Sequence, residues 1–458
     1  MRLNANSLTN PIVSMKALVT ALCLCAMLNT GHAQSHNYEA AHKGQLSPEL
    51  RQWSDNSIAK RHSSTATLAL QNSEGEALAN ASITVRQSSK AFCFGSALNE
   101  WVIDGNPDFK AEDPAKFRQW FEKHFNCGTP ASTLHWKLME SETGKDGVGV
   151  WYADGAIQWM FDRDMQMLGH AVSWENPELV PDWVKAAPDA DTLQRLLKGR
   201  IDHLVGRYNP WISHWVGINE MLDYDSISAQ FDTEEFKFRP WLYKELKTYD
   251  PSLKLLVNEA GILAEPGRVE EYKSLIQGLI DDGAPIDIIG IQAHFWPRDQ
   301  QYINFENVKQ RLDSLAELGL PIWITEFDYA HADENVRANQ LEGFYRLAYA
   351  HPAVQNIKSW GYWENAHWRA DWGTPVALVN KDWHDAESGK RLNALMNEWN
   401  TELASQSDDK GQLKLQGYHG DYIADIQTSD GKTFSATFSL DAKNNGQTIT
   451  LKDNSDTK

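Results

Sequence analysis

Between residues 91 and 400 the chain alternates short apolar runs with longer amphipathic stretches. The short runs are rich in β-branched and aromatic residues, which is typical of strands buried on both faces. The longer stretches repeat apolar residues at helical spacing, as Leu193, Leu197 and Leu204 do in one and Val308 and Leu312 in another. We expect eight strands, at residues 92–97, 125–129, 167–172, 215–219, 255–258, 288–292, 322–325 and 357–362.

Each expected strand is followed by an amphipathic stretch, so the pattern is one of eight strand-then-helix units. This order favours an α/β fold in which a (β/α)8 barrel, the TIM barrel, closes on itself. An open doubly wound sheet is the alternative, but no glycine-rich phosphate loop follows any of the expected strands. We therefore predict a catalytic (β/α)8 barrel at residues 91–402.

The two ends of the chain show the period-two alternation of half-buried strands instead. The alternation runs through residues 65–87 and 411–451, and turn signals such as Glu74-Gly75 and Asp430-Gly431 interrupt it. We predict that the two ends form one small accessory β-sandwich into which the barrel is inserted. Residues 61–90 are its N-terminal part and residues 403–458 its C-terminal part.

The first 33 residues have the composition of a secretory signal peptide. Arg2 and Lys16 supply positive charge, residues 17–28 are apolar, and Ala33 ends a small-residue cleavage site. The apolar run is too short to cross a bilayer, so we expect no membrane insertion. These features predict a secreted protein, extracellular or periplasmic, and the polar residues 34–60 predict a linker.

The formal net charge of −19 narrows the classes of partner. Nucleic acids and anionic membranes are bound by clustered Lys and Arg, and the chain has no long basic run. The 19 Trp residues fit either a large core or a sugar-binding cleft.

Cys93 and Cys127 lie beyond the signal segment. In an exported protein such a pair can form a disulfide. The interpretation that we favour is that they are two separate, small, buried side chains.

Three glutamates, Glu220, Glu259 and Glu326, stand at the carboxyl ends of expected strands. In a (β/α)8 barrel that end carries the active site. Hydrolysis of a glycosidic bond needs two carboxyl groups across the bond, one of which protonates the leaving oxygen. The fourth and seventh strands lie across the barrel mouth from each other, so Glu220 and Glu326 are the pair that we expect to flank a sugar.

Polar residues beside this pair suit the same chemistry. Asn219 directly precedes Glu220 and can hydrogen-bond a substrate 2-hydroxyl, an interaction that strengthens as positive charge develops. His294 follows the sixth strand and can orient Glu326 and hold it ionised.

These motifs, in this order, make the chain similar to glycoside hydrolase family 10, the xylanase family, and especially to its plant-type branch. The resemblance covers roughly residues 66–440. The matching motifs are Asn219-Glu220, Thr325-Glu326-Phe327-Asp328, Gln292 with His294, and Gly169-His170 with Trp174. The tryptophans that wall the glycone subsites of the family resemble Trp360 and Trp368.

The resemblance implies a retaining endo-β-glycanase in which Glu326 is the nucleophile and Glu220 the acid and base. It implies a polysaccharide or oligosaccharide substrate, xylan first, with no metal and no cofactor, and we expect a monomer. The substrate-binding residues that it implies are Asn219, His294, Gln292, His170, Trp174, Trp136, His135, Trp360 and Trp368.

The chain departs from the family after the second strand. Where the family carries Glu-Asn-x-Met/Leu-Lys-Trp, residues 131–136 read Ala-Ser-Thr-Leu-His-Trp. His135 replaces a lysine and Ser132 an asparagine that contact sugars on the non-reducing side, while Trp136 stays. Two alternatives therefore remain open: hydrolysis of a different, modified or marine β-glycan, and glycan binding with little turnover.

Overall fold

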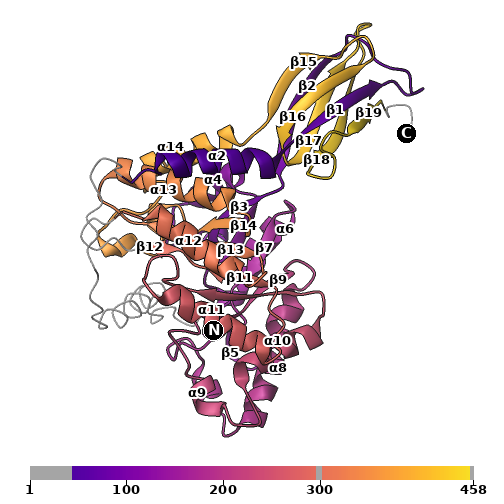
Figure 1. Cartoon of the computed structure of the whole chain (residues 1–458). Helices are drawn as coiled ribbons and strands as arrows, with labels where there is room; N and C mark the ends of the chain where they lie inside the picture. Colours follow the sequence, from indigo (N-terminus) through magenta and orange to yellow (C-terminus); the bar gives the residue numbers. More distant parts are fainter. Residues whose placement is uncertain (1–43, 296–301, 454–458) are drawn as a thin grey trace.

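Eight parallel strands close into a barrel at the centre of the molecule (Figure 1). The computed structural model describes residues 44–295 and 302–453 of the 458-residue chain. In the order in which they pair, the barrel strands are β3 (Cys93–Leu98), β4 (Cys127–Pro130), β7 (Gln166–Gly169), β9 (His214–Asn219), β10 (Lys254–Glu259), β11 (Ile288–Ile291), β13 (Ile322–Tyr329) and β14 (Val354–Ser359). β14 pairs with β3 and closes the ring. The predicted (β/α)8 barrel is confirmed.

A helix follows each barrel strand and packs on the outside of the ring. These helices are α4 (Asp113–His124), α6 (Gly149–Phe161), α8 (Ala190–Tyr208), α10 (Phe238–Tyr249), α11 (Arg268–Asp281), α12 (Phe305–Ala316), α13 (Glu334–Ala350) and α14 (Glu387–Glu398). The apolar stripes expected from the sequence are buried: Leu193, Leu197 and Leu204 in α8, and Val308 and Leu312 in α12. Burial of such stripes against the strands is the main force that holds the outer ring in place.

Short elements in the loops after the strands build the mouth of the barrel. They are α3 (Glu100–Ile103), α5 (Trp136–Met139), the hairpin of β5 (Glu140–Glu142) and β6 (Lys145–Asp146), α7 (Asp182–Lys185), α9 (Ser228–Phe231), η3 (Glu364–Ala366) and η4 (Ala370–Trp372). Two further short strands extend the barrel wall at its mouth: β8 (Ser173–Trp174) pairs with β9, and β12 (His294–Phe295) pairs with β13.

The two ends of the chain form the accessory β-sandwich, as predicted. One sheet has the order β16 (Gln412–Tyr418), β1 (Ser63–Gln71), β19 (Thr448–Lys452), and the other the order β15 (Glu402–Gln406), β2 (Ser82–Lys90), β17 (Gly420–Gln427), β18 (Thr433–Leu440). Every second residue of β1 is buried, and Leu68 and Leu70 share a core with Ile83 and Tyr422 of the other sheet. In Figure 1 the indigo and yellow strands lie interleaved.

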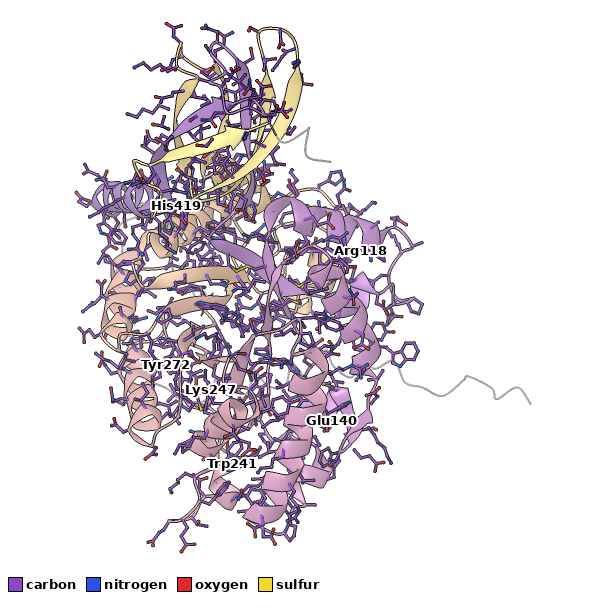
Figure 2. All side chains as sticks on the ribbon, turned by 90° about the vertical axis from the view of Figure 1, so that its right-hand side faces the viewer. Arg118, Glu140, Trp241, Lys247, Tyr272 and His419 are labelled. Carbon is purple, nitrogen blue, oxygen red and sulfur yellow. A yellow bond between two sulfur atoms is a disulfide. The ribbon has the colours of Figure 1, made fainter. Side chains whose placement is uncertain are left out.

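The sandwich stands at the amino end of the barrel strands. β2 ends at Lys90 and β3 begins at Cys93, so the chain passes directly from one sheet into the barrel. Figure 2 shows His419 where the sandwich meets the barrel and Glu140, from the loop after β4, toward the opposite end. The mouth of the barrel is therefore free of the sandwich.

The predicted linker at 34–60 is wrong over its second half, because helix α2 (Pro48–His62) begins there. Ser47 caps the helix, accepting a hydrogen bond from Leu50 N, and Pro48 occupies its first turn. Few of its residues are apolar, which is why composition suggested a linker. The helix packs against α13 nonetheless, with Ile58 buried in the main core. The first part of the predicted linker lies outside the described residues.

Cys93 and Cys127 form a disulfide, so the interpretation that we favoured from the sequence is wrong. The two residues begin the adjacent strands β3 and β4, and their Cα atoms are 5.8 Å apart. This separation lies within the usual range for a disulfide. Adjacency in the barrel, which spacing in the sequence does not reveal, brings the two sulfur atoms together.

Among the described residues, no helix is both long and apolar enough to cross a membrane. The predicted signal segment at 1–33 lies outside the described residues.

Candidate active site

Glu220 and Glu326 both lie at the carboxyl end of the barrel, on strands that are not neighbours. Glu220 follows β9 directly and has a φ of 54°, an uncommon left-handed conformation for a residue with a side chain. Its backbone N–H donates to the carbonyl of Asn258, 2.9 Å away, which fixes the turn. Glu326 lies within β13 and is only 4% exposed.

The Glu326 carboxylate is surrounded by hydrogen-bond donors. Asn258 donates from Nδ2 to Oε1 at 2.7 Å, and His294 Nε2 lies 3.2 Å from Oε2. His170 Nε2 lies 3.5 Å from Oε1. Hydrogen bonds from two or more donors fix the orientation of a carboxylate.

His294 bridges Glu326 and a second carboxylate, Asp328. Its Nδ1 lies 3.0 Å from Asp328 Oδ1. Burial disfavours the charged imidazolium, but the Asp328 and Glu326 carboxylates outweigh it and raise the pKa of His294 to about 9. The ring is therefore charged at neutral pH and donates from both nitrogens, as the sequence led us to expect for the Glu326 contact.

Asp328 connects this bridge to the aromatic wall. It accepts a hydrogen bond from Trp368 Nε1 at 2.7 Å and forms an ion pair with Arg369 at 2.9 Å. Burial opposes ionisation of Asp328, but Arg369 and His294 hold its pKa below the ordinary value. One carboxylate thus positions both the histidine beside Glu326 and a tryptophan of the expected glycone wall.

Glu220 has a different electrostatic environment. Burial raises the pKa of Glu220 to about 8, and the negative charges of Glu326 and Asp223 act in the same direction. Gln292 Nε2 donates to Glu220 Oε1 at 2.8 Å and moderates the shift. Glu220 is therefore mainly protonated at neutral pH, while the donors around Glu326 suit an ionised carboxylate.

Asn258 connects the two halves of the site and was missed from the sequence. Its Nδ2 donates to Asn219 Oδ1 at 2.9 Å as well as to Glu326, and its Oδ1 accepts from Thr325 Oγ1 at 2.7 Å. Its position just before Glu259, at the end of the fifth strand, was the signal that could have identified it. The Asn219 amide is held in place by this contact.

Glu259, the third glutamate at a strand end, supports the loop that carries Glu220. Its Oε2 accepts from Leu222 N at 2.9 Å, and Arg268 lies 3.6 Å from its Oε1. Burial, together with the charges of Asp223 and Glu220, raises its pKa well above the ordinary value. Through these contacts Glu259 stabilises the loop that follows Glu220.

Rings gather around the carboxylates as the sequence suggested. Five pairs of predicted residues are in ring contact: His135 with Trp174 at 5.4 Å, His135 with His170 at 5.7 Å, His170 with Trp174 at 6.3 Å, His170 with Trp360 at 5.3 Å, and His294 with Trp368 at 4.8 Å. Trp136 contacts a different group: it packs edge-on against Trp183 at 5.7 Å and beneath the Arg200 guanidinium. Trp136 is buried, and its contacts support the loop rather than line this cluster.

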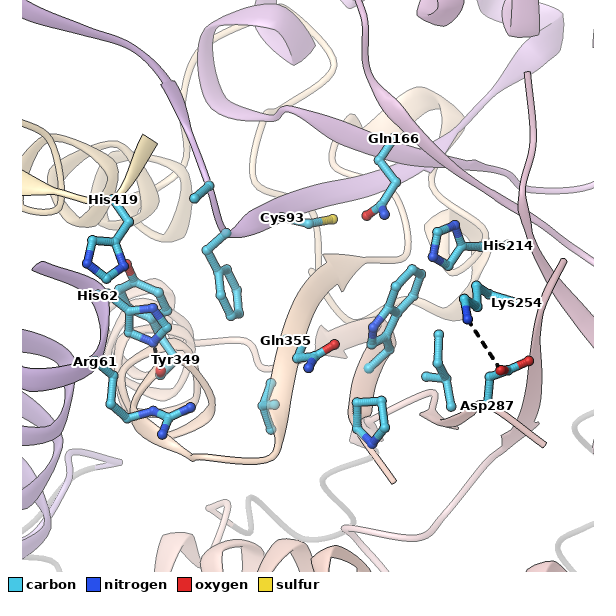
Figure 3. A pocket seen from close by; sticks show the side chains of 16 residues that line it. Arg61, His62, Cys93, Gln166, His214, Lys254, Asp287, Tyr349, Gln355 and His419 are labelled. Atoms are coloured by element: carbon cyan, nitrogen blue, oxygen red, sulfur yellow. Dashed lines mark hydrogen bonds and ion pairs between the residues drawn. The ribbon is translucent and has the colours of Figure 1, made fainter. Parts of the chain in front are cut away.

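A cavity of about 530 Å³ lies at the other end of the barrel, beside the sandwich (Figure 3). His214 and Lys254 begin barrel strands there, and His419 comes from the sandwich. Among the described residues that line it, Asp287 is the only acidic one, and it is paired with Lys247 at 2.9 Å and Lys254 at 3.6 Å. Figure 3 shows the Lys254–Asp287 pair. This end lacks the two carboxyl groups that glycoside hydrolysis requires.

A family model described as Glycosyl hydrolase family 10 matches residues 84–390, well over half of the chain. The chain belongs to this family. The match spans all eight barrel strands, including those that lead to Glu220 and carry Glu326. Family 10 membership and the observed barrel therefore agree with the resemblance that the motifs indicated.

Two curated relatives illustrate the range of proteins to which this family 10 chain is similar. Endo-1,4-beta-xylanase 1 of Arabidopsis thaliana is 31% identical over 380 residues, which are 81% of this chain and 37% of the relative. The anti-sigma-I factor RsgI6 of Acetivibrio thermocellus is 28% identical over 397 residues, which are 85% of this chain and 48% of the relative. The chain thus spans about half or less of the length of these relatives.

The fold of this family 10 chain is also found in solved structures. Xylanase 10B from Thermotoga petrophila RKU-1, in complex with xylobiose, superposes with a TM-score of 0.58 at 20% sequence identity. The alignment covers 67% of this chain and 94% of the xylanase. At this identity the match concerns the barrel fold.

Proposed function

We propose that the protein is a secreted retaining endo-β-glycanase that hydrolyses xylan or a related β-linked polysaccharide. The observation that carries the proposal is the contrast between its two carboxyl groups. Glu220 has a pKa raised to about 8 and can donate a proton, whereas Glu326 accepts hydrogen bonds from Asn258 and His294. Retaining hydrolysis requires one proton donor and one ionised nucleophile.

In the first step, a Glu326 oxygen attacks the anomeric carbon and the bond from that carbon to the leaving oxygen breaks. Glu220 gives its proton to that oxygen, so the shortened chain leaves as an alcohol. In the second step, Glu220, now ionised, takes a proton from water, and the water oxygen attacks the anomeric carbon. The bond to Glu326 breaks, Glu220 is protonated again, and the product keeps its β configuration.

Neighbouring groups support these two steps. The imidazolium of His294 stabilises the Glu326 carboxylate before attack and receives it again as a leaving group in the second step. Asn219, held by Asn258, is the group proposed to bind the 2-hydroxyl of the sugar. Trp174, Trp360 and Trp368, together with His170, are proposed to bind the glycone sugars by apolar contact and hydrogen bonding.

Xylan is the substrate that we place first, because relatives named endo-1,4-beta-xylanases match about 80% of the chain at about 30% identity. A different β-glycan is the second candidate. Burial lowers the pKa of His135 to about 3, and His170 and Arg200 add to the shift, so His135 is neutral where the family has a lysine. Its Nε2 has no hydrogen-bond partner among the described residues.

Secretion is part of the proposal. The predicted signal at 1–33 supports it, and so does the Cys93–Cys127 disulfide, since disulfides form and persist mainly in oxidising compartments. Periplasmic and extracellular placement both satisfy these observations.

The test is release of reducing ends from soluble xylan, mixed-linkage glucan, mannan and marine β-glycans, with the wild type and Glu326→Ala in parallel. Cleavage of xylan by the wild type alone supports the first candidate. Cleavage of another glycan, with xylan left intact, supports the second candidate, a different β-glycan. The change of substrate would then be attributed to residues 131–135.

If the wild type cuts no glycan, the proposed activity is wrong and glycan binding without turnover gains support. We keep that alternative in view because one relative is named an anti-sigma-I factor rather than a hydrolase. The complete set of Glu220, Glu326, Asn219 and His294 argues against it.

A further inference from the structure

Trp151, in the first turn of α6, is the most exposed large hydrophobic residue among those the structure describes, at 78%. Trp159, on the same helix, is buried at 7%, so α6 does bury an indole where the core offers room. Val148, three residues before Trp151, is 49% exposed. Residues three apart lie on the same helix face, so the two side chains form one apolar patch.

The first turn of α6 is fixed to the loop that replaces the family's sugar-binding motif. Gly149 lies so close to Thr133 that a side-chain carbon at position 149 would collide with the Thr133 carbonyl oxygen. Thr133 is held in turn by Glu100, which accepts from its Oγ1 at 2.8 Å and from its N–H at 3.2 Å. His135 follows two residues later and contacts His170 and Trp174. The turn that carries the patch is therefore packed against the same loop that brings His135 into the candidate site.

The loop after the first barrel strand holds the other side of this turn. Tyr152 packs on Trp101, with ring centroids 4.0 Å apart, and its hydroxyl accepts from Asn106 Nδ2 at 3.2 Å. These contacts keep Tyr152 inward and leave its neighbour Trp151 pointing to solvent. Because α6 begins after a strand of the barrel, its first turn belongs to the face that carries Glu220 and Glu326.

The charged side chains near the patch are engaged with one another. Asp146 hydrogen-bonds His203 at 2.8 Å, and Asp154 accepts from Arg207 Nε at 2.9 Å and from the Tyr208 hydroxyl at 2.9 Å. Such pairs offer little to a charged partner, whereas an indole face and a valine suit the apolar face of an uncharged pyranose. A neutral glycan chain is the occupant that these groups fit.

We infer that Trp151 and Val148 form an outlying sugar platform, which binds an uncharged β-glycan chain beyond the candidate site, on the side of the loops that follow β3 and β4. The inference rests on the proposed function and extends it to long substrates. Trp151 and Val148 take no part in the contacts that the structure describes around Glu220 and Glu326, so the platform increases the affinity for polymers and leaves the turnover of short substrates unchanged.

The test compares Trp151→Ala with Phe161→Ala, a matched control in the last turn of the same helix, where Phe161 is 44% exposed. Both changes are made in the wild type and in Glu326→Ala, so that binding can be measured without cleavage. Retardation in native gels containing soluble xylan or mixed-linkage glucan gives the affinity. Hydrolysis of a short chromogenic xylobioside gives kcat and KM at the central site.

We expect Trp151→Ala to weaken polymer binding by about tenfold, the effect of losing one aromatic contact, with Phe161→Ala and short-substrate kinetics unchanged. Equal retardation of Trp151→Ala and its parent would overturn the inference. So would a wild-type dimer that Trp151→Ala converts to a monomer with polymer binding intact, because the patch would then bind a second copy. If the wild type hydrolyses no substrate, by contrast, the proposed function is wrong. The gel-retardation measurements still test the platform in that case.

Discussion

The two ends of the barrel differ in how their polar groups are connected, more than in how many they have. The amino end has a hollow of about 530 Å³, with His214, Lys254 and Asp287 around it. There the His214 ring stacks on Trp323, and Asp287 is neutralised by two lysines. At the carboxyl end, Asn258 and His294 link the groups around Glu326 into one network, while the Glu220 carboxyl accepts a hydrogen bond from Gln292.

The comparison teaches that a hollow alone does not identify an active site. Burial lowers the pKa of His214 to about 4, so this ring at the amino end is a neutral packing group. At the carboxyl end, burial raises the pKa of Glu220 to about 8, whereas the Glu326 carboxylate accepts hydrogen bonds from Asn258 and His294. Acid–base chemistry depends on that difference between neighbouring groups.

Removal of Glu326 is expected to have the largest effect. Glu326→Ala should lower kcat/KM by on the order of 10⁴-fold, because no covalent intermediate can form. Asp287→Asn, at the amino end, is the matched loss of a carboxylate and should leave kcat/KM within about twofold. Initial rates on a soluble β-glycan, with circular dichroism to verify folding, give the comparison. Equal losses in the two variants would contradict the assignment of the site to the carboxyl end.

Loss of the proton donor should come next. Glu220→Gln should lower kcat by about 10² to 10⁴-fold on natural substrates. A substrate whose leaving group is a weak base, such as a dinitrophenolate, does not need the proton in the first step, so its burst of product should survive. Stopped-flow absorbance measures this burst. If the burst is lost in proportion to the steady-state rate, Glu220 does not act as the proton donor to the leaving group.

The bridging amide should matter less than either carboxyl group. Asn258→Ala removes the donor to Glu326 and the contact that holds Asn219, and misplacement of this kind costs up to about a hundredfold. Asn356→Ala, a buried amide within β14 that accepts from Lys358, serves as the control for loss of a buried side chain. If the two variants have the same kcat/KM, the network around Asn258 has no special role.

The pH profile should reflect the Glu220 environment. Glu220 must be protonated to act as the acid, so kcat/KM should fall as the pH rises through about 8, by tenfold per unit beyond it. Gln292→Ala removes a hydrogen bond that favours the ionised form, so the basic limb should move to higher pH. A limb that does not move, or that moves to lower pH, would contradict this account of the Gln292 contact.

The disulfide at the amino end should affect stability and leave activity almost unchanged. Cys93→Ala/Cys127→Ala should lower the free energy of unfolding by about 2 to 4 kcal/mol, since the crosslink restricts the unfolded chain. Urea titration measures the change, and kcat/KM well below the melting temperature should stay within about twofold. A large loss of activity in a still-folded variant would mean that the two ends of the barrel are coupled.

The barrel could be predicted from the sequence because each strand and helix is specified locally by its own apolar pattern. The last strand shows the limit of this reasoning: we expected 357–362, and the structure has Val354–Ser359. The apolar residues Trp360 and Tyr362 extended the pattern past the end of the strand. Trp360 stands just beyond β14 instead, and there it contacts His170.

Long-range contacts account for what could not be predicted. Helix α2 has few apolar residues, and its packing on α13 adds to the Ser47 cap in stabilising it. The disulfide depends on which strands are neighbours. Asn258 is an ordinary polar residue in the sequence, and its importance arises from three partners on β9 and β13. Glu220 and Glu326 could be predicted as a pair because their motifs are local and specific.

The central claim, that Glu326 and Glu220 divide the work of retaining hydrolysis, is tested most directly by trapping the intermediate. A 2-deoxy-2-fluoro xylobioside with a good leaving group slows the second step more than the first, so a covalent glycosyl-enzyme should accumulate. The account predicts one added sugar by intact mass, located on Glu326 by peptide mapping and absent from Glu326→Ala. A label on another residue, or steady turnover with inverted product and no label, would contradict it.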